Sequence, residues 1–230
     1  MHPIRLILMV VAILMASAQV SASSSLDAAV ARYTDTEDGR AAYVRAVEAR
    51  FGAANDDDGG AGRARVERLL LPLTRAAQME QPLVVVTSRD DVNAYALPGL
   101  VVVHRGMLAL VTDDGELSVL LAHELGHLAL AHPVRGIHRS LRAAYLARRA
   151  ARAKDIDDGA RAFVDAAMHA DLGLHEEREA DQWAAALLPR AGIAPAVAVG
   201  LWDHLEAAGI PDDSRTHPSY EERKKIYAMR

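Results

Sequence analysis

The chain has 230 residues, of which 51% are hydrophobic, so it can build one domain with a sizeable core. Its formal net charge of −5 argues against a general nucleic-acid-binding protein, because such proteins present a basic surface. It contains no cysteine, which excludes a disulfide framework and a lipid-modified cysteine.

The N-terminus has the features of an export signal. Arg5 gives a positive start, residues 6–16 are an uninterrupted apolar run, and Val20-Ser21-Ala22 offers small residues for cleavage. A bilayer span needs about twenty apolar residues, so this run is too short. We predict a signal peptide over residues 1–22, with Ala16-Ser17-Ala18 as another cleavage site and an uncleaved anchor as the alternative. The expected location is the periplasm, with secretion as the second choice.

Helices are expected before the first strand. Residues 26–54 favour one helix, which ends in an acidic, glycine-containing run up to Gly60 that we interpret as a solvated linker. Residues 23–60 are therefore expected to form an N-terminal helix and acidic linker, and residues 61–230 the main domain. That domain should open with a helix over Ala61–Met79.

Two strands are expected next. Leu83–Val86 and Leu100–Val103 are short β-branched runs bounded by proline or glycine. The remainder of the chain reads as helices joined by short loops, so the fold class is α+β and mostly helical, with a small sheet.

The most informative motif is His123-Glu124-Leu125-Gly126-His127, which lies in an apolar run. On a helix, residues four apart lie on the same face, so two imidazoles can bind one metal ion while Glu124 flanks it. Burial of three such polar groups on an apolar helix would be costly unless a metal satisfied them. The motif therefore predicts a zinc hydrolase with one Zn²⁺ per chain.

A third ligand must come from elsewhere, because catalytic zinc usually has three protein ligands and one open position. Glu177 and Asp181 are four apart, which allows Glu177 to bind zinc while Asp181 accepts a hydrogen bond from a ligand histidine. An ordinary solvated helix start is the alternative. His132 does not fit the metzincin spacing, so we interpret it as a C-terminal residue of the motif helix.

The interval between the ligand segments is basic. Residues 133–154 contain arginines and one lysine but no acidic residue. We expect a soluble helical lid here, and contact with an anionic membrane surface is the alternative.

The C-terminal segment offers two further site residues. His217 could approach the zinc as a fourth, displaceable ligand that keeps an enzyme latent, and Arg223 could stabilise the oxyanion of a tetrahedral intermediate. The alternative is structural: Thr216-His217-Pro218 would cap the last helix, and Arg223 would pair with a nearby carboxylate.

Together these segments resemble the zinc metallopeptidases numbered family forty-eight, which include the CAAX prenyl endopeptidases, HtpX, the mitochondrial Oma-type protease and the periplasmic β-barrel assembly-enhancing protease. The resemblance covers roughly residues 82–227 and corresponds to the catalytic domain. Four blocks carry it: Val92-Asn93-Ala94-Tyr95-Ala96-Leu97-Pro98-Gly99; Glu116 to His127; Glu177-Arg178-Glu179-Ala180-Asp181; and Thr216-His217-Pro218-Ser219 with Arg223. One departure is Pro98-Gly99-Leu100, where the family usually has Pro-Gly-Gly.

The resemblance implies a gluzincin in which His123, His127 and Glu177 bind zinc and Glu124 is the catalytic base. It also implies that an edge strand beside the zinc pairs with the substrate backbone. Leu100, Val101, Val102, Val103 and His104 are our candidate for that strand, and a plain core strand is the alternative.

The expected function is a zinc-dependent endopeptidase of the cell envelope that hydrolyses unfolded or misassembled proteins. The alternative is a latent or non-proteolytic quality-control factor that holds peptides. The expected partner is a polypeptide substrate, and the chain could also contact the membrane or the envelope assembly machinery peripherally. No nucleic-acid partner is expected.

Overall fold

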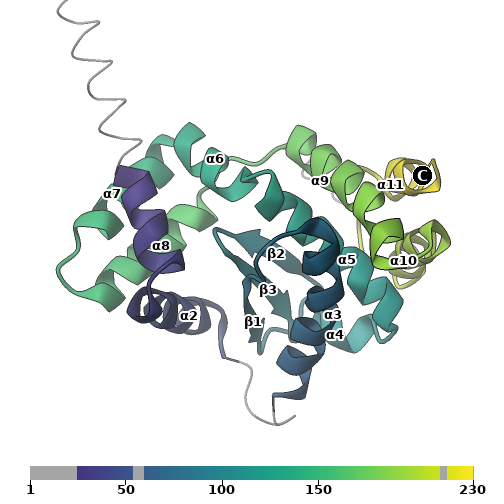
Figure 1. Cartoon of the computed structure of the whole chain (residues 1–230), viewed down its shortest axis with the longest axis horizontal. Helices are drawn as coiled ribbons and strands as arrows, with labels where there is room; N and C mark the ends of the chain where they lie inside the picture. The colour runs from purple at the N-terminus through teal and green to yellow at the C-terminus, as the bar shows by residue number, and fades with distance from the viewer. Residues whose placement is uncertain (1–24, 54–59, 213–216, 230) are drawn as a thin grey trace, which may run out of the picture.

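The computed structural model describes residues 25–53, 60–212 and 217–229 (Figure 1). The predicted signal peptide and linker residues 54–59 lie outside these ranges. The helix expected over residues 26–54 is two helices, residues 25–34 and α2 (Glu37–Phe51). Thr36 separates them, because its side chain accepts a hydrogen bond from the backbone N–H of Gly39 and so caps α2.

The sheet has three strands in the order β1-β3-β2. β1 (Leu83–Thr87) runs parallel to β3 (Leu100–His104), and β2 (Ala94–Leu97) runs antiparallel to β3. Pro98 and Gly99 form the tight turn between β2 and β3. Gly99 has φ 68°, a left-handed conformation that glycine adopts without a steric penalty. The missing second glycine does not disturb this turn, because Leu100 already belongs to β3.

The expectation that Leu100, Val101, Val102, Val103 and His104 form an edge strand is wrong. β3 is hydrogen-bonded on both sides, and all five of its residues are buried. A strand that is apolar on both faces is typical of the centre of a sheet. The edge strand next to the motif helix is β2, which the sequence did not reveal because it is short and half alanine.

Helices cover both faces of the sheet (Figure 1). Val84, Val101 and Val103 point to a core shared with one group of helices, and Val85 and Val102 to a core shared with another. The first group is α3 (Ala61–Ala77), α5 (Asp114–Ala129), α9 (Leu174–Leu187), α10 (Pro195–Ala207) and α11 (Tyr220–Ala228). The second includes the helix of residues 25–34, α2, α7 (Leu141–Arg152) and α8 (Ile156–Met168).

Three short elements complete the described part of the chain. They are α4 (Arg105–Leu110), α6 (His132–Arg139) and the 3₁₀ helix η2 (Leu188–Ala191). This architecture confirms the predicted α+β, mostly helical fold with a small sheet beside the motif helix. Within the described residues, no helix combines the length and the apolar character that a membrane crossing requires.

Candidate metal centre

Two of the three candidate ligands, His123 and His127, come from α5, whose start and burial both follow from its sequence. The Asp113 side chain accepts a hydrogen bond from the backbone N–H of Glu116 and caps the helix. Apolar residues then hold the helix between the sheet and α9, so His123, Glu124 and His127 are only 3%, 4% and 4% exposed. Three polar side chains thus lie side by side in the protein interior.

The third side chain, Glu177, comes from α9, which packs closely on α5. A methyl group at Gly126 would lie 2.9 Å from the carbonyl oxygen of Ala180 and 3.1 Å from its Cα. Glycine on one helix and alanine on the other therefore let the two backbones approach each other. This approach carries Glu177, which is 6% exposed, to the two histidines.

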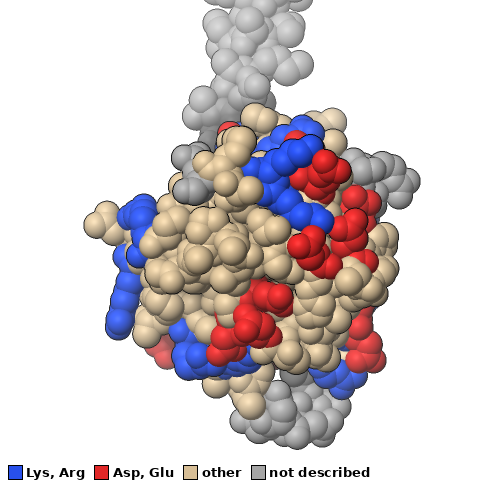
Figure 2. Space-filling model, turned by 90° about the vertical axis from the view of Figure 1, so that its right-hand side faces the viewer, with Lys and Arg blue, Asp and Glu red and all other residues tan. Residues whose placement is uncertain are grey.

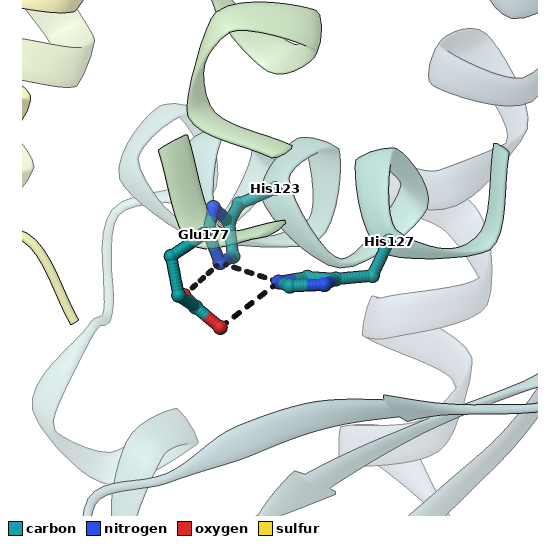
Figure 3. Close-up of side chains that lie close together, drawn as sticks. All are labelled: His123, His127 and Glu177. Carbon is teal, nitrogen blue, oxygen red and sulfur yellow. Dashed lines mark hydrogen bonds and ion pairs between the residues drawn. The ribbon is translucent and has the colours of Figure 1, made fainter. Parts of the chain in front are cut away.

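His123, His127 and Glu177 form a compact group (Figure 3). The two Nε2 atoms are 3.1 Å apart. Glu177 Oε2 lies 3.3 Å from His123 Nε2, and Glu177 Oε1 lies 3.4 Å from His127 Nε2. Ligands at about 2.0–2.1 Å from one tetrahedral ion are about 3.3 Å from each other. The donor set and its spacing therefore fit a tetrahedral metal ion with one open position.

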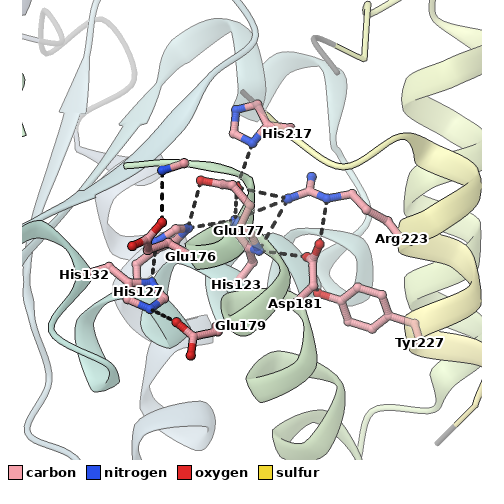
Figure 4. A network of polar contacts seen from close by, with 11 residues as sticks. His123, His127, His132, Glu176, Glu177, Glu179, Asp181, His217, Arg223 and Tyr227 are labelled. Atoms are coloured by element: carbon pink, nitrogen blue, oxygen red, sulfur yellow. Dashed lines mark hydrogen bonds and ion pairs between the residues drawn. The ribbon is translucent and has the colours of Figure 1, made fainter. Parts of the chain in front are cut away.

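The outer nitrogen of His123 is held by Asp181 (Figure 4). His123 Nδ1 lies 2.8 Å from Asp181 Oδ1, and Asp181 is 0% exposed. Two further donors satisfy the same carboxylate: Arg223 Nε at 2.9 Å and the Tyr227 hydroxyl at 3.2 Å, both from α11. The C-terminal helix thus fixes the group that orients a ligand histidine.

Arg223 is itself enclosed. Its guanidinium stacks 4.2 Å from the centroid of the Trp202 ring, and its Nη2 lies 3.6 Å from Glu177 Oε2. The pairing with a nearby carboxylate that we considered as an alternative therefore exists. Arg223 also lines the cleft beside His123 and Glu124, so it faces the place where a substrate would bind.

The outer nitrogen of His127 is held by His132, for which the sequence predicts no role in the site. His132 is 0% exposed, and its Nδ1 lies 3.0 Å from His127 Nδ1. Its Nε2 lies 3.2 Å from Glu179 Oε2. The expectation that His132 ends the motif helix is wrong, because α5 ends at Ala129 and α6 begins at His132.

The turn between these helices explains this placement. Ala131 has φ 54°, an uncommon left-handed conformation for a residue with a side chain. The chain therefore changes direction between α5 and α6, and this places His132 next to His127. No motif in the sequence pointed to this turn, and the five-residue spacing of the two histidines is not a helical repeat.

The charged groups of the centre shift one another's pKa values. Burial opposes the charged form of His123, but the carboxylates of Asp181 and Glu177 outweigh it and raise its pKa to about 10. Burial opposes ionisation of Glu177, yet hydrogen bonds from His123, His127 and His217 hold its pKa well below the usual range. The pKa of Asp181 is also lowered, because Arg223 and His123 outweigh its burial. The group is a tightly paired cluster of opposite charges.

A cleft of about 300 Å³ opens beside this centre. His123, Glu124, His217 and Arg223 line it together with Ala94 at the start of the edge strand β2. Within the described residues, no hydrogen bond or ion pair engages the carboxylate of Glu124. This carboxylate is therefore available to a molecule in the cleft.

His217 lies at the mouth of the same cleft. Its Nδ1 is 2.7 Å from Glu177 Oε2, and its side chain is 49% exposed. It therefore contacts a ligand carboxylate instead of joining the three-residue group. Thr216 lies outside the described residues, and the side chain that caps α11 is Ser219.

Comparison with known proteins agrees with this geometry. The sequence is 29% identical over 145 residues to metalloprotease LoiP of Escherichia coli strain K12, which covers 58% of this chain and 56% of that protein. It is 30% identical over 142 residues to metalloprotease YcaL of the same organism, which covers 57% and 53%. It is 45% identical over 51 residues to the mitochondrial metalloendopeptidase OMA1 of Bos taurus, which covers 22% and 10%.

The match to the two E. coli proteins thus spans about half the length of each. The characteristic sequence pattern of Peptidase family M48 matches residues 61–227, which include α5, α9 and α11. Those helices supply the metal-binding group, the carboxylate in the cleft and the residues behind them. Within these helices, His123, His127 and Glu177 form a group that could bind a metal ion. From the match over residues 61–227 we conclude that the chain belongs to peptidase family M48.

Proposed function

We propose that this protein is a zinc-dependent endopeptidase of the cell envelope that acts on unfolded or misassembled proteins. One observation carries the proposal: three ligand atoms lie at tetrahedral spacing beside a cleft that also contains the unengaged carboxylate of Glu124. The envelope location rests on the signal-like pattern of residues 1–22.

The catalytic roles follow from the positions of the side chains. His123, His127 and Glu177 would hold a zinc ion, which when bound would act as a Lewis acid on a peptide carbonyl and would lower the pKa of water at the site towards neutral pH. Glu124 accepts a proton from that water and then delivers it to the leaving amine.

Arg223 serves the same reaction from the side of α11. Its guanidinium lines the cleft, so it can neutralise negative charge that develops on the carbonyl oxygen in the transition state. Its bond to Asp181 also keeps the carboxylate directed at His123. The Arg223 side chain thus stabilises the developing oxyanion and also, through Asp181, orients His123.

Both ligand histidines have a positioning partner. Asp181 orients His123, and His132 orients His127 while Glu179 holds His132 from behind. Residues that hold the outer nitrogen of a ligand histidine fix its tautomer and its ring, and their loss costs about 10–100-fold in metal affinity. We assign His132 and Glu179 this positioning role.

The substrate is a polypeptide in extended conformation. β2 has one edge that is not paired within the described sheet, and residues at its start line the cleft. An extended peptide could add to that edge through main-chain hydrogen bonds. We therefore assign substrate pairing to Ala94–Leu97 in place of Leu100–His104.

His217 gives the site a regulatory element. Its ring contacts Glu177 Oε2 at 2.7 Å and is half exposed, so a substrate entering the cleft could displace it. The same contact favours the second candidate function, a latent factor that holds peptides without cleaving them.

The test compares wild type with Glu124→Gln on an unfolded protein substrate, with metal content measured in both. We expect wild type to cleave the substrate and the variant to keep its metal and lose cleavage. Equal cleavage by both proteins would disprove the role of Glu124. Absence of bound metal after purification in zinc would remove the basis of the proposal. Aggregation suppression without cleavage by either protein would favour the peptide-holding function.

A further inference from the structure

Helix α7 lies at the outer edge of the molecule, away from α9, α10 and α11 (Figure 1). It packs on α8 through three alanines that are fully buried, Ala143, Ala147 and Ala150. None of its residues lines the cleft beside His123 and Glu124. The expectation that this basic interval forms a lid over the site is therefore wrong, and its exposed face needs another explanation.

The exposed face combines apolar and cationic side chains. Leu141 is 93% exposed and Tyr145 is 61% exposed. Arg148 and Arg152 follow at helical spacing, so the four side chains form one stripe opposite the buried alanines. Apolar side chains of this size are usually buried, and a helix that exposes them between cations is typical of an interfacial element.

The cations of this region are not neutralised by the protein. α7 contains no acidic residue, and Arg142, Arg148, Arg149, Arg152 and Lys154 are all exposed. Within the described ranges, none of these five makes an ion pair. Beside them lies a cavity of about 640 Å³ between α7 and α8, lined by Tyr145, three of the arginines and Lys154. Its two acidic residues are already engaged: Asp155 caps α8, and Asp158 pairs with Arg161.

The opposite side of the molecule differs. Figure 2 shows the side of α9, α10 and α11, where basic and acidic side chains lie next to one another. Arg178 pairs with Glu222 there, and Lys224 pairs with Asp203 and Glu206. Unpaired positive charge on a protein of net charge −5 is thus concentrated on a face that also exposes apolar side chains.

We propose that this α7 face, defined by Leu141, Tyr145, Arg148 and Arg152, docks on the surface of an anionic lipid bilayer. Leu141 and the Tyr145 ring would enter the boundary between headgroups and acyl chains, while the arginines contact anionic headgroups. The cavity beside Tyr145 gives those headgroups room next to four cations. A soluble polyanion would use the cations but would gain nothing from the two apolar side chains.

Vesicle co-sedimentation tests the proposal, with the protein beginning at Ser23 so that it retains all described elements and lacks the apolar run of residues 6–16. Chelator is present throughout, because docking needs neither metal nor peptide cleavage, and failure of this test would leave the proposed function untouched. We expect binding to vesicles of phosphatidylglycerol and phosphatidylcholine, little binding to phosphatidylcholine alone, and a loss of binding as salt is added.

Two variants and a matched control locate the surface. A basic residue near an anionic bilayer contributes about 1 kcal/mol, or about fivefold in affinity, so Arg148→Gln with Arg152→Gln should weaken binding about 25-fold. Leu141→Ser with Tyr145→Ser should weaken vesicle binding but leave binding to heparin unchanged. The control is Leu71→Ser with Arg75→Gln, which changes the same kinds of side chain at exposed positions on α3. We expect this control to bind like wild type.

Several results would overturn the proposal. They are equal binding to neutral and anionic vesicles, equal losses for the α7 and α3 variants, and binding to heparin without binding to vesicles. Because all substituted side chains are exposed, unchanged thermal unfolding should accompany each variant and shows that a loss of binding is not a loss of fold.

Discussion

The metal centre and the α7 face both contain several charged side chains, but those of the centre are buried and paired, whereas those of α7 are exposed and unpaired within the described residues. In the centre Glu177, Asp181 and Arg223 are at most 7% exposed, and each has at least two polar partners. On α7 the cations are exposed and unpaired within the described residues. Burial of an unpaired charge is costly, whereas solvent screens an exposed charge. The charged groups of the centre therefore need polar partners, and the cations of α7 do not.

We therefore expect that removal of one buried group from the metal centre lowers stability or metal affinity far more than a substitution on the surface does. Glu124 is the exception within the centre, because its carboxylate has no partner among the described residues. Glu124→Gln should therefore leave folding and metal binding almost unchanged while it lowers kcat/KM about 10²–10⁴-fold. Peptide hydrolysis, metal analysis and thermal unfolding measure the three quantities. Glu116→Gln, on the same helix but outside the cleft, is the control and should retain activity.

Asp181 should give the largest stability effect. Asp181→Asn removes the nearer of the two carboxylates that Arg223 contacts and leaves only Glu177, at 3.6 Å, so we expect a cost of about 3–5 kcal/mol in the free energy of unfolding. Chemical denaturation measures this cost, and metal affinity should fall as well. Asp203→Asn, which breaks an exposed pair with Lys224, should cost less than about 1 kcal/mol. Similar losses for the two variants would contradict the contrast between buried and exposed charges.

His132 tests whether the network extends to the second ligand histidine. His132→Ala should lower metal affinity about 10–100-fold, because His127 loses the group that fixes its ring. Competition with a chelator measures the affinity, and the visible spectrum of the cobalt-substituted protein reports the ligand geometry.

His132→Asn keeps a polar group at this position and should restore part of the affinity. The exposed His138 on α6 is the matched control, and His138→Ala should behave like wild type. An unchanged affinity and spectrum in His132→Ala would remove the positioning role.

His217 should give the smallest effect, since its side chain is half exposed and lies at the mouth of the cleft. If its contact with Glu177 restrains the site, His217→Ala should raise the initial rate of cleavage a few-fold with little change in stability. Stopped assays with a short peptide and with an unfolded protein measure the rate. The same rate in both proteins would rule out latency through this histidine.

Those parts of the site that depend on local geometry could be predicted from the amino-acid sequence. His123, Glu124 and His127 share one face because a helix repeats every 3.6 residues, whatever surrounds it. The strand character of Leu83–Val86 and Leu100–Val103 was equally readable from their β-branched composition. Glu177 and Asp181 could be proposed from their spacing and from the family resemblance.

Those features that depend on contacts between distant segments could not be predicted from the sequence and follow from the packing of the fold. The close packing of Gly126 on Ala180 brings Glu177 to the histidines, and the left-handed Ala131 allows His132 to contact His127. Strand order is also a matter of long-range pairing, which is why β3 lies in the centre and β2 at the edge. The sequence showed that residues 133–154 are basic, but only the packing of α7 on α8 decided that this charge faces solvent away from the cleft. The local periodicity of a helix or strand determines which side chains share a face, whereas tertiary packing determines which other residues, or solvent, that face contacts.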